Sequence, residues 1–165
     1  MATIGVIETT VSAEVASTST SFTQVVESSA LTSGTTYYIV CHALVDGDAS
    51  NDVFEWQLVD STNSDAILSN STLKREPHSI DTSQSYCFVG RITAGSDGGG
   101  IAFEQRTQDG TRTVRTQYLS MLIFDVSNLE SSDFFYANDS TSATHTTSYV
   151  DRATLTATSP TSGDT

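Results

Sequence analysis

The segment from Asp46 to Asp52 carries the side chains best suited to hold a metal ion. Asp46, Asp48 and Asp52 lie close together in the sequence, and carboxylate oxygens are the ligands that Ca²⁺ prefers. The segment lacks the glycine at the sixth position and the glutamate at the twelfth position that define an EF-hand loop. These three aspartates are therefore a calcium candidate, and a solvated turn is the alternative interpretation.

No other group of side chains predicts a catalytic or metal-binding chemistry. His42, His78 and His145 lie far apart, without a neighbouring cysteine or second histidine, which disfavours zinc. The sequence contains no Gly-x-Ser-x-Gly elbow and no phosphate-binding loop. Gly98-Gly99-Gly100 lies between two predicted strands, so it offers no helix N-terminus to an anion. We expect no catalytic residue and no cofactor, and therefore a protein that is not an enzyme.

Four aromatic residues form a candidate platform for a sugar. Tyr37, Tyr38, Trp56 and Tyr118 fall within segments that we expect to be strands. Aromatic rings on strands more often fill a core. A glycan is therefore a candidate ligand, and burial of these rings is the alternative.

Three arginines are candidates for contact with another subunit. Arg106, Arg112 and Arg115 flank Gln108-Asp109-Gly110, a sequence that predicts a hairpin between two strands. They could pair with acidic residues across that hairpin, or they could clamp an acidic neighbouring subunit. A short apolar burst in the last part of the chain adds to the interface candidates, which are Arg106, Arg112, Arg115, Phe134, Phe135 and Tyr136.

The elements that must position these residues are predicted to be strands. Apolar residues alternate with polar ones, and β-branched and aromatic residues dominate the apolar positions. The predicted strands cover residues 21–27, 36–45, 53–60, 66–73, 84–94, 101–107 and 111–126.

The alternation also predicts which side chains enter the core. In residues 53–60, Phe54, Trp56 and Leu58 should face inward, and the residues between them should face outward. Residues 36–45 are almost continuously apolar, so we expect that strand to be central and buried on both faces.

Strands at this spacing, separated by turns, are typical of an all-β sandwich or barrel. Cys41, Trp56 and Cys87 resemble the Cys…Trp…Cys pattern of immunoglobulin domains, although Tyr86 lies one residue before the second cysteine and not two. An immunoglobulin-like sandwich is therefore the alternative fold. In a reducing compartment both cysteines should be free, buried and hydrophobic in character.

The charge excludes further classes of function. The chain has 165 residues, with 20 acidic and 7 basic side chains and a formal net charge of −13. A nucleic-acid-binding protein needs a basic face, and no apolar run is long enough to span a membrane. Abundant Ser, Thr and Asp with a single lysine, Lys74, suggest a hydrated surface adapted to high salt, as in a halophilic setting. The alternative is an acidic surface that is kept soluble by its net charge.

We expect three parts in the chain: an N-terminal arm (1–19), a β-sandwich domain (20–129) and a strand-like C-terminal extension (130–165). The extension resembles the start of the chain, since residues 147–152 align with 20–25. Such a repeat suggests either the opening of a second copy or a segment, residues 131–165, that adds strands to a neighbouring subunit's sheet. The alternative is chance similarity between two Ser/Thr-rich segments. The first residues lack the features of a secretory signal, so we expect synthesis in the host cytoplasm without export.

Residues 20–128 resemble the jelly-roll-type β-sandwich modules of tailed bacterial or archaeal viruses. The resemblance depends on residues 33–40, on Arg75-Glu76-Pro77, on the Asp109-Gly110 hairpin and on Leu122-Ile123-Phe124. It implies a jelly-roll fold and a structural virion protein of the capsid decoration or turret type. It also implies a homotrimer that binds the major capsid protein or another virion protein at the virion surface. The alternative is a carbohydrate-binding module of a receptor-binding fibre.

Overall fold

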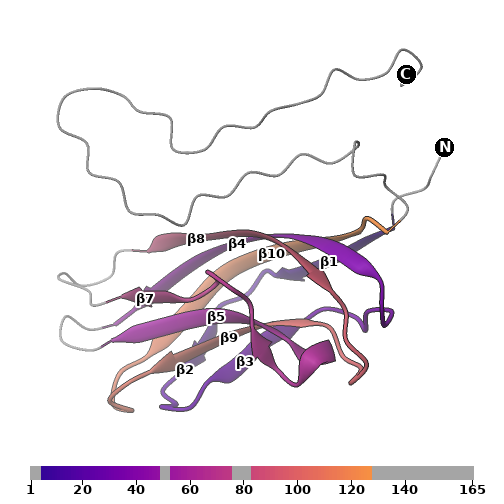
Figure 1. The fold of residues 1–165 in the computed structure, drawn as a ribbon. Coiled ribbons are helices and arrows are strands. Elements are labelled where there is room, and N and C mark those ends of the chain that lie inside the picture. Colours follow the sequence, from indigo (N-terminus) through magenta and orange to yellow (C-terminus); the bar gives the residue numbers. More distant parts are fainter. Residues whose placement is uncertain (1–4, 49–52, 76–82, 128–165) are drawn as a thin grey trace, which may run out of the picture. The chain divides into compact units, whose positions relative to one another are not determined.

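In the computed structural model, which describes residues 5–48, 53–75 and 83–127, the chain forms two antiparallel β-sheets that face each other (Figure 1). The strands are β1 (Val6–Val11), β2 (Val15–Ser17), β3 (Thr23–Glu27), β4 (Thr36–Gly47), β5 (Phe54–Asp60), β6 (Ala66–Ile67), β7 (Leu73–Arg75), β8 (Gln84–Thr93), β9 (Ile101–Thr107) and β10 (Val114–Asp125). A short 3-10 helix, η1 (Ser61–Asn63), follows β5. No helix in the described part of the chain has the length and apolar character needed to cross a membrane.

The strand order is that of a jelly roll. One sheet has the order β1-β10-β4-β8, with β2 also paired to β10, and we call it the β1 sheet. The other has the order β3-β9-β5-β6, with β7 also paired to β5, and we call it the β3 sheet. Apart from β1–β2 and β5–β6–β7, successive strands alternate between the sheets, so the chain wraps around the core as two interlocked Greek keys do. This order confirms the predicted jelly-roll-like sandwich and differs from the immunoglobulin arrangement.

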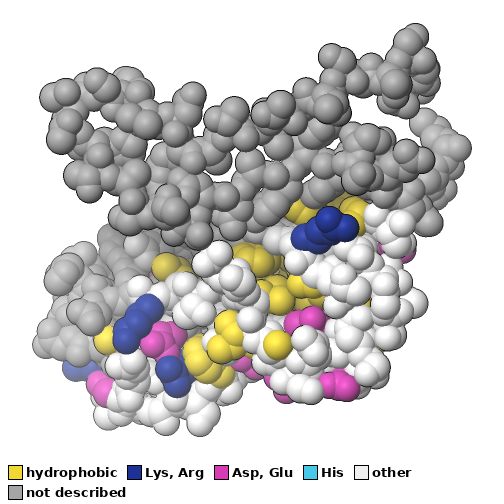
Figure 2. Space-filling view, in the orientation of Figure 1, with side chains coloured by type: hydrophobic (Ala, Val, Ile, Leu, Met, Phe, Trp, Pro, Cys, Tyr) yellow, Lys and Arg dark blue, Asp and Glu magenta, His cyan; other side chains and the backbone are white. Residues whose placement is uncertain are grey.

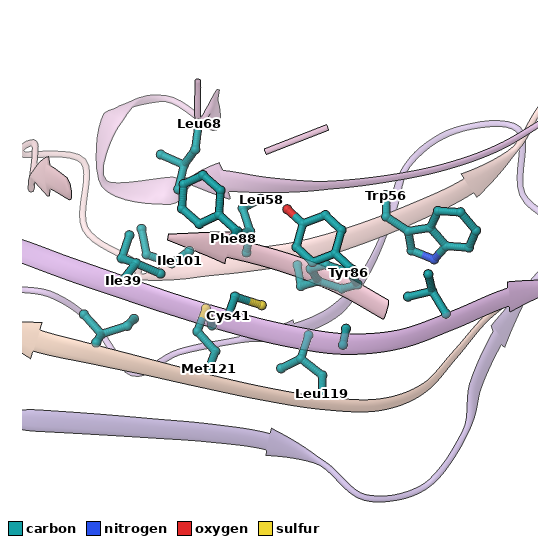
Figure 3. Packing of buried hydrophobic residues seen from close by; sticks show 14 of the residues in the cluster. Ile39, Cys41, Trp56, Leu58, Leu68, Tyr86, Phe88, Ile101, Leu119 and Met121 are labelled. Atoms are coloured by element: carbon teal, nitrogen blue, oxygen red, sulfur yellow. The ribbon is translucent and has the colours of Figure 1, made fainter. Parts of the chain in front are cut away.

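Alternating side chains from both sheets fill the core (Figure 3). Phe54, Trp56 and Leu58 on β5 are fully buried, as the alternation predicted. From the opposite sheet, Ile39 and Met121 lie on β4 and β10 and are also fully buried. Each buried side chain of this size stabilises the fold by about 1.5–3 kcal/mol.

The sequence placed the first strand at residues 21–27, whereas two strands precede it. β1 pairs with β10 from Val6↔Phe124 to Val11↔Leu119, and β2 pairs with the same strand from Val15↔Thr116 to Ser17↔Val114. Both strands belong to the segment that we expected to be an N-terminal arm. Their inward residues Ile7, Val11 and Val15 are only half-buried, and Val6 is exposed, so the pattern was too weak to indicate strands.

The predicted hairpin around Asp109-Gly110 is wrong. β9 belongs to the β3 sheet and β10 to the β1 sheet, so the connection crosses from one sheet to the other. Gly110 takes a positive φ of 72° there, which glycine adopts at little cost. An Asp-Gly turn signals a sharp reversal, but it does not specify whether the two strands pair.

β10 contains a bulge between Thr116 and Tyr118. Before it, Val114 and Thr116 are buried; after it, Leu119, Met121 and Ile123 are buried. The extra residue moves the inward-facing set from even to odd positions. Tyr118 is 43% exposed as a result.

Candidate functional site

Two of the three aspartates of the calcium candidate surround an arginine. Arg115 Nη1 lies 3.5 Å from Asp46 Oδ1, and Arg115 Nη2 lies 3.8 Å from Asp48 Oδ2. Gln117 Nε2 donates to the other oxygen of Asp46 at 2.7 Å. The guanidinium thus supplies the positive charge that a calcium ion would bring. Asp52 lies outside the described residues.

The protonation of Asp48 follows from this arrangement. Burial alone would raise the pKa of its carboxyl group, but the Thr113 backbone N–H donates to it at 2.8 Å. That hydrogen bond and the nearby Arg115 hold the pKa of Asp48 below its usual range. Within the described residues, no group of three or more His, Cys, Asp or Glu side chains could hold a metal ion.

Arg106 belongs to a separate cluster on the outer face of the β3 sheet. Its guanidinium contacts the Glu55 carboxylate and lies 4.4 Å from the ring centroid of Phe22. Lys74 Nζ lies 3.7 Å from Glu55 Oε1, and Gln108 Nε2 donates to the same oxygen at 3.3 Å. Figure 2 shows dark blue and magenta side chains side by side on a surface that is otherwise largely uncharged.

The three interface arginines therefore do not form one site. Arg106 lies on β9 in the β3 sheet, and Arg115 lies on β10 in the β1 sheet. The backbone N–H of Arg112 donates to Asp109 Oδ1 at 3.2 Å within the connection between these strands. Phe134, Phe135 and Tyr136 lie outside the described residues.

The candidate sugar platform is also divided. Tyr37 is 5% exposed and Trp56 is fully buried between the sheets. Tyr38 is half-buried and Tyr118 is exposed, and both face outward from the β1 sheet. The platform therefore loses Trp56, the aromatic residue with the largest stacking surface.

The two cysteines occupy opposite faces of the β1 sheet. Cys41 on β4 is buried, whereas Cys87 on β8 is exposed, and neither forms a disulfide. The expectation that both are buried is therefore wrong for Cys87. The immunoglobulin pattern also fails. In that pattern the two cysteines join two sheets, whereas Cys41 and Cys87 lie on neighbouring strands of one sheet.

β4 is central, as predicted, but only one of its faces is buried. Tyr38, Val40 and Leu44 alternate with the core residues and remain half-buried on the outer face, beside the exposed His42. The continuous apolar run was interpreted as burial on both faces. The described strands instead leave the second face apolar and outward, and sequence reasoning missed this surface.

Comparisons with known proteins bear on the fold. No family model matches the chain, and no curated protein matches it. Among solved structures, it is similar to a chain in "Structure of infectious bursal disease virus Gx strain", with a TM-score of 0.52 and 8% sequence identity. The match covers 74% of this chain and 32% of that chain, so this chain spans about a third of the viral protein's length. The strand order and this similarity define the protein as a jelly-roll β-sandwich that resembles part of a viral chain in fold.

Proposed function

We propose that the protein is a structural component of a virus particle. The observation that carries this proposal is the jelly-roll fold, which is similar to that of a chain from a virus structure. The two charged clusters are consistent with a structural role, because each cation in them is paired with carboxylates of the same chain. We further propose that the protein is not an enzyme.

The second part of the proposal is the position of the protein in the virus particle. We propose a capsid decoration or turret protein of a tailed bacterial or archaeal virus. It would assemble as an oligomer, with a homotrimer as the expected form, on the major capsid protein or a neighbouring virion protein. This assignment depends on the sequence resemblance and on the hydroxyl-rich, acidic composition, which suits a surface exposed to solvent. Assembly would occur in the host cytoplasm.

The test is the copy number of the chain in intact particles. Gradient-purified particles from the source of this sequence would be analysed by quantitative mass spectrometry and by electron cryomicroscopy. We expect a fixed ratio of this chain to the shell protein and density for the sandwich on the outer surface. Absence of the chain from purified particles would overturn the proposal.

A glycan array separates this proposal from the alternative of a receptor-binding module. A decoration protein should show no saturable glycan binding. Saturable binding that is lost in Tyr118→Ala, and retained in a Tyr37→Phe control, would favour the fibre module instead. The burial of Trp56 is the reason that we expect the array to be negative.

A further inference from the structure

The outer faces of the two sheets differ in kind. On the β3 sheet, most outward side chains of β5, β7 and β9 are polar and bond to one another: Arg106 and Lys74 neutralise Glu55, and Gln57 Nε2 donates to Glu104 Oε2 at 2.8 Å. Ile67 on edge strand β6, which is 58% exposed, is an apolar exception. This face is suited to contact with water.

The outer face of the β1 sheet is apolar. Its strand register aligns outward side chains in rows that run across β1, β10, β4 and β8. Val6 is 54% exposed, Val89 is 42% exposed and Tyr118 is 43% exposed. The apolar members of the rows are Val6, Tyr38, Val40, Leu44, Val89, Tyr118, Leu122 and Phe124. Contiguous apolar surface of this kind marks an interaction site.

Within four of these rows, charge enters only at two opposite edges; in the row beyond them, Arg115 and Asp46 lie on the central strands and pair with each other. The first row contains Val6, Phe124, Tyr38 and Arg91, and the second contains Glu8, Leu122, Val40 and Val89. The third row is Thr10, Ser120, His42 and Cys87, and the fourth ends in Tyr118, Leu44 and Ser85. The acidic residue therefore lies on edge strand β1 and the basic residue on edge strand β8.

We infer that this face docks against the same face of a second copy, about a two-fold axis that runs parallel to the strands between β10 and β4. Such an axis exchanges the two central strands, so each row meets itself in reverse order. Leu122 then lies opposite Val40 of the partner subunit, and Phe124 lies opposite the partner's Tyr38. Ser120 meets the partner's His42, so polar residues also meet polar residues.

The charges of Glu8 and Arg91 favour this axis over one perpendicular to the strands. The exchange places β1 over the partner's β8, so Glu8 faces the partner's Val89, with the partner's Arg91 one row away. An arginine side chain can span that step, which is about 6.8 Å for two residues along a strand. Within one copy the two charges are three strands apart, roughly 14 Å, so they cannot pair with each other. An axis perpendicular to the strands would place β1 over β1 and bring no opposite charges together.

The area is sufficient for a reversible contact. Four strands about 4.8 Å apart and four rows about 6.8 Å apart cover roughly 500 Å² in each copy. The pair then covers roughly 1,000 Å², the lower limit for a specific interface. The pairing leaves the β3 sheet free, so it is compatible with a trimer built through other surfaces. The pairing requires only copies of this chain, and it goes beyond the proposed function.

The test exchanges the two charges between copies. The full-length variants Glu8→Arg and Arg91→Glu are each examined by sedimentation velocity, with circular dichroism to verify folding. Each variant alone places like charges together twice, and we expect its self-association to weaken about tenfold or more, which corresponds to at least 1.4 kcal/mol. In an equimolar mixture the arginine introduced at position 8 meets the glutamate introduced at position 91, and Arg91 of one variant meets Glu8 of the other. We expect the mixture to associate as the wild type does.

Two further measurements test the apolar part. Leu122→Lys should abolish association, whereas Gln24→Lys, which adds the same charge to an exposed position on the β3 sheet, should leave it unchanged. Cys87 lies in the third row and serves as a native probe, because its alkylation should slow as the protein concentration rises.

Three results would overturn the inference. The first is a wild-type chain whose association state does not change with concentration and is unaffected by Leu122→Lys. The second is a mixture that associates no better than the separate variants. The third is protection of Cys87 that is independent of concentration, which would mean that another part of the same chain covers the face.

Discussion

Glu55 shows how a single buried charge is accommodated in this sandwich. Its side chain is only 8% exposed, and a carboxylate at such a position is stable only if it is paired and hydrogen-bonded. Arg106 provides the direct contact, and Lys74 and Gln108 lie at the edge of the cluster. The two cations differ in exposure, since Lys74 is 54% exposed and Arg106 is 34% exposed.

This difference predicts unequal effects of mutation. Arg106→Ala should lower the free energy of unfolding by about 1–3 kcal/mol, because it leaves a buried carboxylate with the exposed Lys74 as its only cation and the Gln108 amide as its donor. Lys74→Ala should cost less than about 1 kcal/mol, since solvent screens the longer contact. Urea denaturation of the two variants provides the comparison, and equal losses would contradict this account of the cluster.

A second prediction at the residue scale concerns pH. Burial, with a contribution from Cys87, raises the pKa of the Cys41 thiol from 9.0 to about 12. The unfolded thiol loses its proton near pH 9 and the folded one does not, so this contribution to stability is present below pH 9 and is lost as the pH rises toward 12. The loss should be about 1.4 kcal/mol per pH unit within that window.

Urea denaturation between pH 8 and pH 11, under reducing conditions, measures this slope. Cys41→Ala should be less stable at pH 8 but should show a shallower decline, and the exposed Cys87→Ala is the matched control with the wild-type slope. Burial also raises the pKa of Tyr86, so some decline remains in every variant. Parallel slopes in all three proteins would refute the role of Cys41.

At the scale of the elements, the two sheets are in close contact where β4 ends and β5 begins. A Cβ atom added to Gly47 would overlap the ring of Phe54, and both residues are buried. Only a residue without a side chain therefore allows the β4 backbone to pass over this ring.

Gly47→Ala should thus lower the free energy of unfolding by about 1–3 kcal/mol, the usual cost of overpacking a core. Gly5→Ala is the control, because the nearest atom to its added Cβ is 3.7 Å away, on Asp125. Thermal denaturation followed by circular dichroism measures both. A Gly47→Ala variant as stable as the control would mean that the ring of Phe54 can move aside.

Alternation predicted the inward set of β5 and the long strands correctly, because a period of two is a local property of the sequence. It could not assign strands to sheets, so Arg106 and Arg115 were expected across one hairpin and lie in two sheets. It also missed the consequence of the bulge after Thr116, which depends on pairing with β4. The outward apolar face of β4 was interpreted as core, because hydrophobicity alone does not reveal what covers a strand.

For the whole molecule, charge sets the response to salt. With 20 acidic and 7 basic side chains and a net charge of −13, the folded state concentrates like charges that the unfolded chain keeps apart. Salt shortens the Debye length to about 3 Å at 1 M and screens this repulsion. The temperature of unfolding should therefore rise as KCl is added at neutral pH.

Differential scanning calorimetry over a KCl series provides the measurement, and a sucrose series separates screening from general exclusion of solute. A transition temperature that falls steadily up to about 2 M KCl would contradict both the repulsion argument and the expected saline setting.

The position of β10 between β1 and β4 determines when this protein can fold during synthesis. The first strand of the β1 sheet, beginning at Val6, pairs with a strand that ends at Asp125, so nearly the whole described sequence must leave the ribosome before that sheet closes. Contacts between such distant residues slow folding to milliseconds or seconds. Until then β1 and β4 expose unpaired edges, which makes an incomplete chain of this kind prone to aggregation.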